Sequence, residues 1–512
     1  MKSKSILLIL AYFLYFSNCA EILCIFVVPV HSHLSVYNAV TMELLSRGHK
    51  ITLISVDPRE NERNHVNVTL IELLSLKETY ESQVQHFLLK PSRFFDHNPF
   101  LEILSSVFKN KHFLNLLKND KKFDLLLMES FGFSPFNALA EYFNVPTVSI
   151  TAGDALSTEH ENRGNVINPV AHPDRLLEFP FAKTFSERLQ SSIYWLTFKY
   201  VVMPLLIVKC DEITEKYFPN NKVKKYYDLT SNVDLLLINA HPVMGFIRPI
   251  LPNTIPLGFL HIYPPQPLPG ILQEILDKNT NGVIFVSFGT VYKPNYFPNV
   301  VQKLLTACEN LPYLFLFKYD GVLDNVPKNM IIQKWFPQSD LLAHGNIKLF
   351  ITQGGQQSME ESILRRVPML IMLISSDQRA NAIRVEDRQI AKVLDIHKND
   401  KINSDDIKNS ILDLVNNKRY KTNIENLTKL VEDVPMTSRD KAVWWIEYVI
   451  RNRGAKHFHY EQKNIPFYQY HYYDVIAFIG AVIVLIILIF MVILRLIGRF
   501  FEMLRNFKIK RD

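Results

Sequence analysis

Residues 335–382 read WFPQSDLLAHGNIKLFITQGGQQSMEESILRRVPMLIMLISSDQRANA, and this stretch decides the fold. Residues 348–352 are a short β-rich apolar run, residues 353–355 are a Gln-Gly-Gly turn, and a helix is expected to begin near Gln356. A helix that begins directly behind a glycine turn presents free N–H groups and the positive end of its dipole, which suits a phosphate. The glycines alone are a weak signal, because many α/β connections use glycine for steric reasons.

The same stretch contains a longer pattern. A W-x-P-Q run precedes the first strand, T-Q-G-G-x-Q-S-x-x-E covers the turn and the helix, and D-Q-x-x-N-A follows the next strand. This pattern resembles the donor-binding signature of the UDP-glycosyltransferases, the membrane-bound glucosyl- and glucuronosyltransferase type, and within them the insect and baculoviral ecdysteroid glucosyltransferase branch. The resemblance implies a UDP-sugar site made by Trp335, Gln338, Gln353, Gly354, Gly355, Gln357, Ser358, Glu361, Asp377 and Gln378.

The resemblance also implies a role for each of these positions. Trp335 would stack on uracil, and Gln338 and Glu361 would hold the ribose. The glycine turn and Ser358 would meet the diphosphate, and the Asp-Gln pair at 377–378 would hold the sugar.

Four positions depart from the family pattern. Gln353 replaces the usual His and Gln357 the usual Asn; a glutamine amide can donate to a phosphate oxygen but carries no charge. Arg366 replaces a Gly before Val-Pro, and Leu373 replaces a Pro before the Asp-Gln pair. Because the resemblance places both near the sugar, we expect them to affect donor affinity or sugar choice.

The amino-terminal part begins with a strand–helix–strand pattern. Residues 22–30 are a continuous apolar run typical of a buried parallel strand, residues 35–47 have helical spacing before Gly48, and residues 51–55 form the next strand. In open α/β sheets, ligands bind beyond the carboxyl ends of the strands. The loop at 29–33 is therefore expected to line a site.

Two histidines in this loop are candidate general bases. A histidine at a strand end can take a proton from a hydroxyl at neutral pH, although a lone loop histidine is more often a surface residue. The family resemblance assigns the base to His33, with His31 as second choice. It also implies that Glu129, at the end of the strand pattern 123–128, hydrogen-bonds the base and stabilises its protonated form. The alternative for Glu129 is a solvated acid at a strand end.

The second half of the chain repeats the α/β alternation. Strands are expected at 283–288, 314–318 and 330–333, with a helix at 298–310. The turn formed by Ser287, Gly289 and Thr290 resembles the family turn beside the donor phosphates, and an ordinary βα turn is the alternative.

The resemblance predicts the GT-B architecture, an α/β fold in which two Rossmann-like domains face each other across a cleft. The prolines that crowd 255–270 predict an interdomain linker. The expected segments are a signal peptide (1–20), an acceptor-binding domain (21–254), the linker (255–270), a UDP-sugar-binding domain (271–440), a closing helix and membrane stalk (441–474), a transmembrane helix (475–494) and a cytosolic basic tail (495–512).

Two apolar segments and their charged flanks predict the membrane topology. A short apolar run behind Lys2 and Lys4 indicates a cleavable signal peptide rather than an uncleaved anchor. Residues 475–494 carry no charge and are long enough to cross a bilayer. The basic tail favours the cytosol, so the body is expected in the lumen. Lys508-x-Lys510 matches an endoplasmic reticulum retrieval signal, with a plain basic flank as the alternative.

Charge and cysteine content exclude some classes of protein. Most of the formal net charge of +7 lies in the tail and at the first lysines, so nothing favours nucleic acid. The four cysteines show no metal spacing or disulfide framework. Asn67 and Asn426 begin glycosylation sequons, consistent with a lumenal glycoprotein.

The acceptor is less defined. Residues 77–118 and 179–218 are rich in Phe, Leu and Tyr, which at helical spacing usually form core. The resemblance implies that they also line the acceptor pocket, so a lipophilic acceptor is expected.

Together these features predict inverting transfer of a sugar from a UDP-sugar to a hydroxyl of a small lipophilic acceptor: a steroid, phenolic or xenobiotic. UDP-glucose is the expected donor and UDP-glucuronate the alternative, with no metal or other cofactor. The resemblance implies a single-pass protein of the endoplasmic reticulum membrane with a role in detoxification, and leaves homo-oligomer formation open. The alternative function is a catalytically impaired lumenal protein that binds UDP-sugar or a lipophile.

Overall fold

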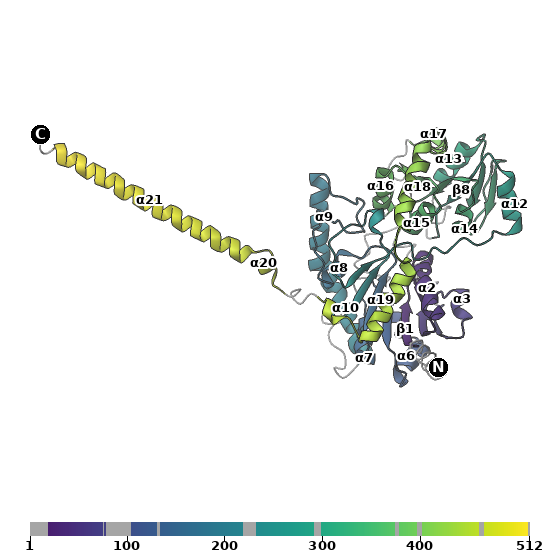
Figure 1. The fold of residues 1–512 in the computed structure, drawn as a ribbon, viewed down its shortest axis with the longest axis horizontal. Coiled ribbons are helices and arrows are strands. Elements are labelled where there is room, and N and C mark those ends of the chain that lie inside the picture. The colour runs from purple at the N-terminus through teal and green to yellow at the C-terminus, as the bar shows by residue number, and fades with distance from the viewer. Residues whose placement is uncertain are drawn as a thin grey trace, which may run out of the picture. The chain divides into compact units, whose positions relative to one another are not determined.

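The computed structural model describes residues 19–74, 76–77, 104–130, 134–218, 232–290, 298–373, 378–396, 402–459 and 465–509. The chain divides into two compact units, one that ends at His459 and one that begins at Tyr460. The first unit contains two parallel β-sheets with helices packed around them (Figure 1). Apart from Cys19 and Ala20, the predicted signal peptide lies outside the described residues.

The first sheet has seven parallel strands in the order β3-β2-β1-β4-β5-β6-β7. Apart from the edge strand β3, its strands are almost fully buried, which explains why the sequence shows continuous apolar runs instead of alternation. The chain order reverses between β1 and β4, and a crevice is expected at such a point. The strands are β1 (Glu21–Phe26), β2 (Lys50–Ser55), β3 (Val68–Glu72), β4 (Leu125–Glu129), β5 (Thr147–Thr151), β6 (Leu235–Ile238) and β7 (Thr254–Pro256). Since β7 pairs with β6, the sheet includes the first two residues of the predicted linker.

The helices of this half are α2 (His31–Ser46), α3 (Glu60–Arg63), α6 (Lys111–Lys118), α7 (Asn137–Phe143), α8 (Ser157–Asn162), α9 (Phe185–Thr197), the π-helix η2 (Phe198–Val202), α10 (Met203–Tyr217) and the 3-10 helix η3 (Pro242–Met244). The expected loop at 29–33 is wrong in part, because α2 begins at His31 and both histidines lie in its first turn. The N-cap, Val30, has no side chain that can cap the helix, so the sequence carries no start signal there.

The helices α9, η2 and α10 run on without a break, and they are core on one face only. Val202, Met203, Leu206 and Cys210 pack into the core of the first domain. The other face exposes a row of large apolar side chains, which we call the apolar stripe: Phe185, Leu189, Ile193, Leu196, Tyr200, Val201, Leu205 and Val208. The expectation that the aromatic and aliphatic residues of 179–218 are core is therefore wrong for this face.

The second sheet has six parallel strands in the order β10-β9-β8-β11-β12-β13, and its chain order reverses between β8 and β11. Its strands are β8 (Val283–Ser287), β9 (Leu314–Lys318), β10 (Met330–Gln333), β11 (Ile347–Thr352), β12 (Met369–Met372) and β13 (Ala391–Leu394). Its helices are α12 (Gly270–Lys278), α13 (Pro298–Cys308), α14 (Gln338–Leu342), α15 (Gln356–Leu364), α16 (Arg379–Asp387), α17 (Ser404–Asn416) and α18 (Lys418–Glu432).

After the second sheet the chain returns to the first. Helix α19 (Ser438–Asn452) lies beside α2 (Figure 1) and places Ala442, Val443, Ile446 and Val449 in the core of the first domain. The short 3-10 helix η6 (Lys456–Phe458) follows, near the end of this unit. The second unit contains α20 (Phe467–Tyr470) and the long apolar helix α21 (Tyr473–Ile509), which is long and apolar enough to cross a membrane.

Helix α15 ends in an unusual way. The residue after its C-cap is Arg366, in the left-handed region with φ of 59°. Its backbone N–H donates to the Ile363 carbonyl, and its half-exposed side chain pairs with Glu432 at 2.6 Å. The family pattern has Gly here, and glycine adopts this conformation without a Cβ clash.

We expect Arg366→Gly to be more stable than Arg366→Ala by about 1 kcal/mol, because both variants lose the ion pair and only glycine relieves the left-handed strain. Chemical denaturation of the two purified variants measures the difference. Equal stabilities, or a more stable alanine variant, would contradict the assignment of strain to this residue.

Candidate functional site

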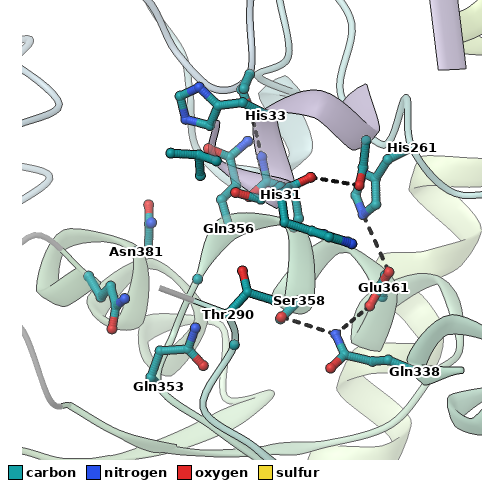
Figure 2. Close-up of a pocket in the computed structure, with 18 of the residues that line it drawn as sticks. His31, His33, His261, Thr290, Gln338, Gln353, Gln356, Ser358, Glu361 and Asn381 are labelled. Atoms are coloured by element: carbon teal, nitrogen blue, oxygen red, sulfur yellow. Dashed lines mark hydrogen bonds and ion pairs between the residues drawn. The ribbon is translucent and has the colours of Figure 1, made fainter. Parts of the chain in front are cut away.

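A cavity of about 480 Å³ lies between the two sheets (Figure 2). From the first half it is lined by the start of α2 and by the residues after β5, and from the second half by the glycine turns after β8 and β11 and the start of α15. The segments that follow β1, β8 and β11 lie at the two points where strand order reverses. For each of the two sheets, the cavity therefore lies at the place where a doubly wound sheet is expected to bind its ligand.

His33 and Glu129 are in contact at the carboxyl ends of the inner strands β1 and β4 of the first sheet. The His33 Nδ1 lies 2.7 Å from Glu129 Oε1, and the Tyr37 hydroxyl donates to the same oxygen at 2.8 Å. Glu129 is only 4 % exposed, whereas His33 borders the cavity. A carboxylate that accepts the Nδ1–H leaves the lone pair on Nε2, the form needed to accept a proton from a ligand.

His31 has a different environment. The Arg59 guanidinium donates to its Nε2 at 2.9 Å, so this nitrogen is already used as an acceptor. Burial, with the nearby Arg59 and Lys318, lowers the pKa of His31 to about 4. Its ring lies 5.4 Å from the ring of Trp335, and the Lys318 ammonium lies 4.3 Å from the centre of that same indole.

The glycine turns are required by close approach of the backbone. Gly289 has φ of +78°, and a Cβ there would lie 2.3 Å from the Gln353 amide nitrogen. Gly354 has φ of +96°, and a Cβ there would lie 3.0 Å from Ile371. Gly289 therefore lets the turn after β8 pack against the Gln353 side chain, and Gly354 lets the turn after β11 pack against Ile371 of β12.

Helix α15 begins at the cavity and contacts the other half of the molecule. The Gln356 amide donates to the Asn239 carbonyl at 2.6 Å, and the Gln357 amide donates to the Ala152 carbonyl at 2.8 Å. Its N-cap, Gly355, has no side chain, so no cap occupies the first backbone N–H groups of the helix. Such a helix start suits an anionic ligand.

A polar cluster lies one turn further along α15. The Gln338 amide donates to Ser358 Oγ at 3.1 Å and to Glu361 Oε2 at 2.6 Å, as Figure 2 shows. Burial raises the pKa of Glu361 to about 7, against the opposing effect of the Gln338 hydrogen bond. Burial likewise raises the pKa of Glu360 to about 8, although it accepts hydrogen bonds from Gln356 and from the Phe259 backbone.

Most of the site residues that the sequence predicts lie around this one cavity. The cavity is bordered by His33, Gly289, Thr290, Trp335, Gln338, Gln353, Gly355, Gln357, Ser358, Glu361 and Gln378. Ser287, the last residue of β8, and Gly354, in the turn after β11, lie next to residues that border the cavity but do not border it themselves. Glu129 does not border it either, but it contacts His33, which does. Asp377 lies outside the described residues.

The expected effect of Arg366 and Leu373 on the sugar is not supported, since neither borders the cavity. Arg366 pairs with Glu432 on the surface, and Leu373 is buried in the apolar core of the second domain. Residues 179–218, expected to line the acceptor pocket, do not border it either. Of the other expected segment, 77–118, the described residues 77 and 104–118 do not border it, and residues 78–103 lie outside the described residues.

Several cavity residues were missed from the sequence. Arg175 and Asp154 border it near Arg384, and the Arg248 and His160 side chains, although burial opposes them, hold the pKa of Asp154 well below its usual range. His261 also borders the cavity. None belongs to a motif, and the carboxyl groups that His261 faces and the Arg248 that pairs with Asp154 lie far away in the chain, so local patterns could not have found them.

Known structures define the class of fold. The chain superposes on CalG4, the calicheamicin glycosyltransferase, with a TM-score of 0.56 over 85% of this chain and 99% of that one, at 17% identity. It superposes on glycosyltransferase VinC, solved in complex with DTDP, with a TM-score of 0.55 over 85% of this chain and 100% of that one, at 14% identity. The two facing parallel sheets are thus a GT-B glycosyltransferase fold, as predicted.

The family follows from sequence comparison. The model of the UDP-glucoronosyl and UDP-glucosyl transferase family matches residues 6–506, and the chain belongs to this family of glycosyltransferases. It is 30% identical to the UDP-glycosyltransferase UGT5 of Dactylopius coccus, over 92% of this chain and 90% of that protein. It is 29% identical to the ecdysteroid UDP-glucosyltransferase of Mamestra brassicae nuclear polyhedrosis virus (85% of each) and 28% identical to the rat UDP-glucuronosyltransferase 1A8 (90% and 89%).

The raised pKa of the buried Glu360 can be tested through the pH dependence of stability. Its pKa in the folded chain lies above that of an exposed glutamate, so its contribution to stability is lost as pH rises from about 4.5 to 8. We expect Glu360→Gln, which keeps the acceptor oxygen, to match the native chain near pH 4.5 and to be more stable by at least about 1 kcal/mol near pH 8. Thermal unfolding across this pH range measures the difference. Glu425→Gln, at a half-exposed surface position, is the control, and a pH-independent difference for Glu360→Gln would contradict the expectation.

Proposed function

We propose that this protein transfers a sugar, with inversion, from a UDP-sugar to a hydroxyl of a small lipophilic acceptor. The observation that carries the proposal is the contact between His33 and a buried carboxylate at 2.7 Å, on the opposite side of a cavity from the start of α15. A base on one side and an anion-binding helix start on the other suit in-line displacement of UDP by an activated hydroxyl oxygen.

In the proposed reaction His33 is the general base. Its Nε2 takes the hydroxyl proton while Glu129 stabilises the imidazolium through Nδ1. The oxygen then attacks the anomeric carbon and the bond to UDP breaks. His31 is a poorer base, because Arg59 donates to its Nε2 and its pKa is lowered to about 4.

The departing diphosphate would be stabilised by the start of α15. Its uncapped backbone N–H groups, Ser358 and the Gln353 amide border the cavity and can donate to phosphate oxygens. The proposed mechanism uses these neutral donors and the helix dipole, and it requires no metal ion.

The remaining roles follow the family pattern. We propose Trp335 for uracil, Gln338 and Glu361 for the ribose, and Asp377 and Gln378 for the sugar. The donor we propose is UDP-glucose, supported by glucosyltransferase names among the relatives. UDP-glucuronate, supported by glucuronosyltransferase names among them, is the other donor to test. Steroids, phenolics and xenobiotics are the proposed acceptors.

The test is product formation by purified protein with each UDP-sugar and a mixed steroid and phenol panel, followed by mass spectrometry. We expect a glycoside whose formation falls by about 10²–10⁴-fold in His33→Ala, because the general base is lost. We expect a fall of at least roughly 10²-fold in Glu129→Gln, because the carboxylate no longer stabilises the imidazolium. UDP affinity should be unchanged in both variants.

The same experiment separates the enzyme from a non-catalytic binder. UDP binding without product from any donor and acceptor would favour the binder. The departures Arg366 and Leu373 no longer support that reading, since both lie away from the cavity, and Gln353 alone remains in its favour.

We further propose that α21 crosses the membrane of the endoplasmic reticulum once, with the body in the lumen and the basic tail in the cytosol. The support is its apolar length and the arginines and lysines that follow residue 494. The other long apolar segment, Phe185–Tyr217, packs one face into the core of the body, so we treat it as a helix of the folded unit.

Carbonate extraction tests this topology. We expect the full chain to stay in the membrane pellet at alkaline pH, because a spanning helix is held by lipid and not by charge. A chain that ends at His459 should be released under the same conditions. Release of the full chain would show that α21 does not span.

A further inference from the structure

We propose that His261 is a positioning residue that holds Glu361 in the orientation that receives the ribose of the donor, and thereby sets donor affinity. The inference rests on the proposed function, since it assumes that Glu361 binds the ribose. His261 lies in the predicted linker, outside every motif of the sequence, and it borders the cavity beside Glu361 of α15.

The imidazole lies between two consecutive carboxyl groups of α15. Its Nδ1 is 3.6 Å from Glu360 Oε2 and its Nε2 is 3.7 Å from Glu361 Oε1; Figure 2 shows the second contact. The side chain is only 5% exposed, and neither ring nitrogen has a full hydrogen bond from a side chain in the described parts of the chain. A buried imidazole whose two nitrogens face acids beyond hydrogen-bond distance is an unsatisfied polar group that needs an explanation.

The backbone around His261 is fixed on both sides. The Leu260 N–H reaches the Asn239 side chain at 3.4 Å, and the Phe259 N–H reaches Glu360 Oε2 at 3.3 Å. On the other side, Arg439 donates to the Ile262 carbonyl at 2.7 Å, and Ile262 is buried in apolar core. The imidazole therefore has little freedom to move away from α15.

The protonation states decide which groups around the imidazole donate hydrogen bonds and which accept them. Burial lowers the pKa of His261 to about 4, against a weaker opposing effect of the Gln357 backbone, so the ring is neutral at physiological pH. A neutral imidazole has one N–H and one lone pair. Glu360, whose pKa is raised to about 8, is protonated and can donate to one nitrogen, which leaves the other N–H to donate to Glu361.

Glu361 would then have a donor facing each of its oxygens, one at hydrogen-bond distance and one beyond it. The Gln338 amide donates to Oε2 at 2.6 Å, and the His261 N–H faces Oε1. The lone pairs that remain on the carboxylate are the ones available to two ribose hydroxyls. An apolar residue at 261 would leave Oε1 without this donor, so the carboxylate could rotate and the ribose contacts would weaken.

The test compares UDP with 2′,3′-dideoxy-UDP, which lacks both ribose hydroxyls, by calorimetric titration of the full chain in detergent. We expect the native protein to bind UDP at least tenfold more tightly, and His261→Leu to bind the two ligands within about twofold of each other. His261→Gln, whose amide both donates and accepts, should keep part of the ratio. Turnover at saturating donor should change less than threefold, while KM for the donor rises.

His112→Gln is the control, since this histidine is exposed on α6 and lies away from the cavity; it should keep the native ratio. If His261 had a purely structural role, its substitution would weaken the binding of both ligands equally and leave the ratio of their affinities unchanged. That result would overturn the inference. If His261→Leu does not fold, the same comparison is made with His261→Gln. If the native chain binds no UDP, both the proposed function and this inference are contradicted. If it binds UDP but the ratio does not change in the variant, only this inference is contradicted.

Discussion

Two glutamine side chains at the start of α15 hold the two halves of the molecule together at the cavity. Gln356 and Gln357 donate to backbone carbonyls that follow β6 and β5, and Gly153 lets Gln356 approach, since a Cβ there would lie 2.9 Å from its oxygen. The same helix start offers its unused N–H groups to the cavity. The position of the anion-binding end relative to His33 is therefore set by side chains that have no charge of their own.

The second feature of the site is a group of buried ionisable side chains whose pKa values are shifted. Glu361 and His261 border the cavity, Glu360 lies against the same imidazole, and burial shifts the pKa of each toward its uncharged form. Three buried titratable groups with opposed shifts are costly for folding, and such groups concentrate at functional sites. Hydrogen bonds from Gln338 and Gln356 offset part of this cost, which explains why the amides of α14 and α15 point inward.

How much could be predicted depended on how local the signal was. The strands β9 and β10, the glycine turn and the Glu129 strand end are encoded by adjacent residues, and the structure has them where the sequence indicated. The start of α2 was missed because Val30 gives no cap, and the apolar stripe was assigned to core because periodicity shows a face but not what covers it. His261 could not be found, since the acids it faces are about one hundred residues away in the chain.

The apolar stripe has a practical consequence for anyone who handles this protein. Contiguous exposed apolar surface of this kind causes soluble proteins to self-associate. A version cut before α21 loses its most hydrophobic helix but keeps the row from Phe185 to Val208 on its surface. Such a fragment would still need detergent, or polar replacements along that row, to remain dispersed in plain buffer.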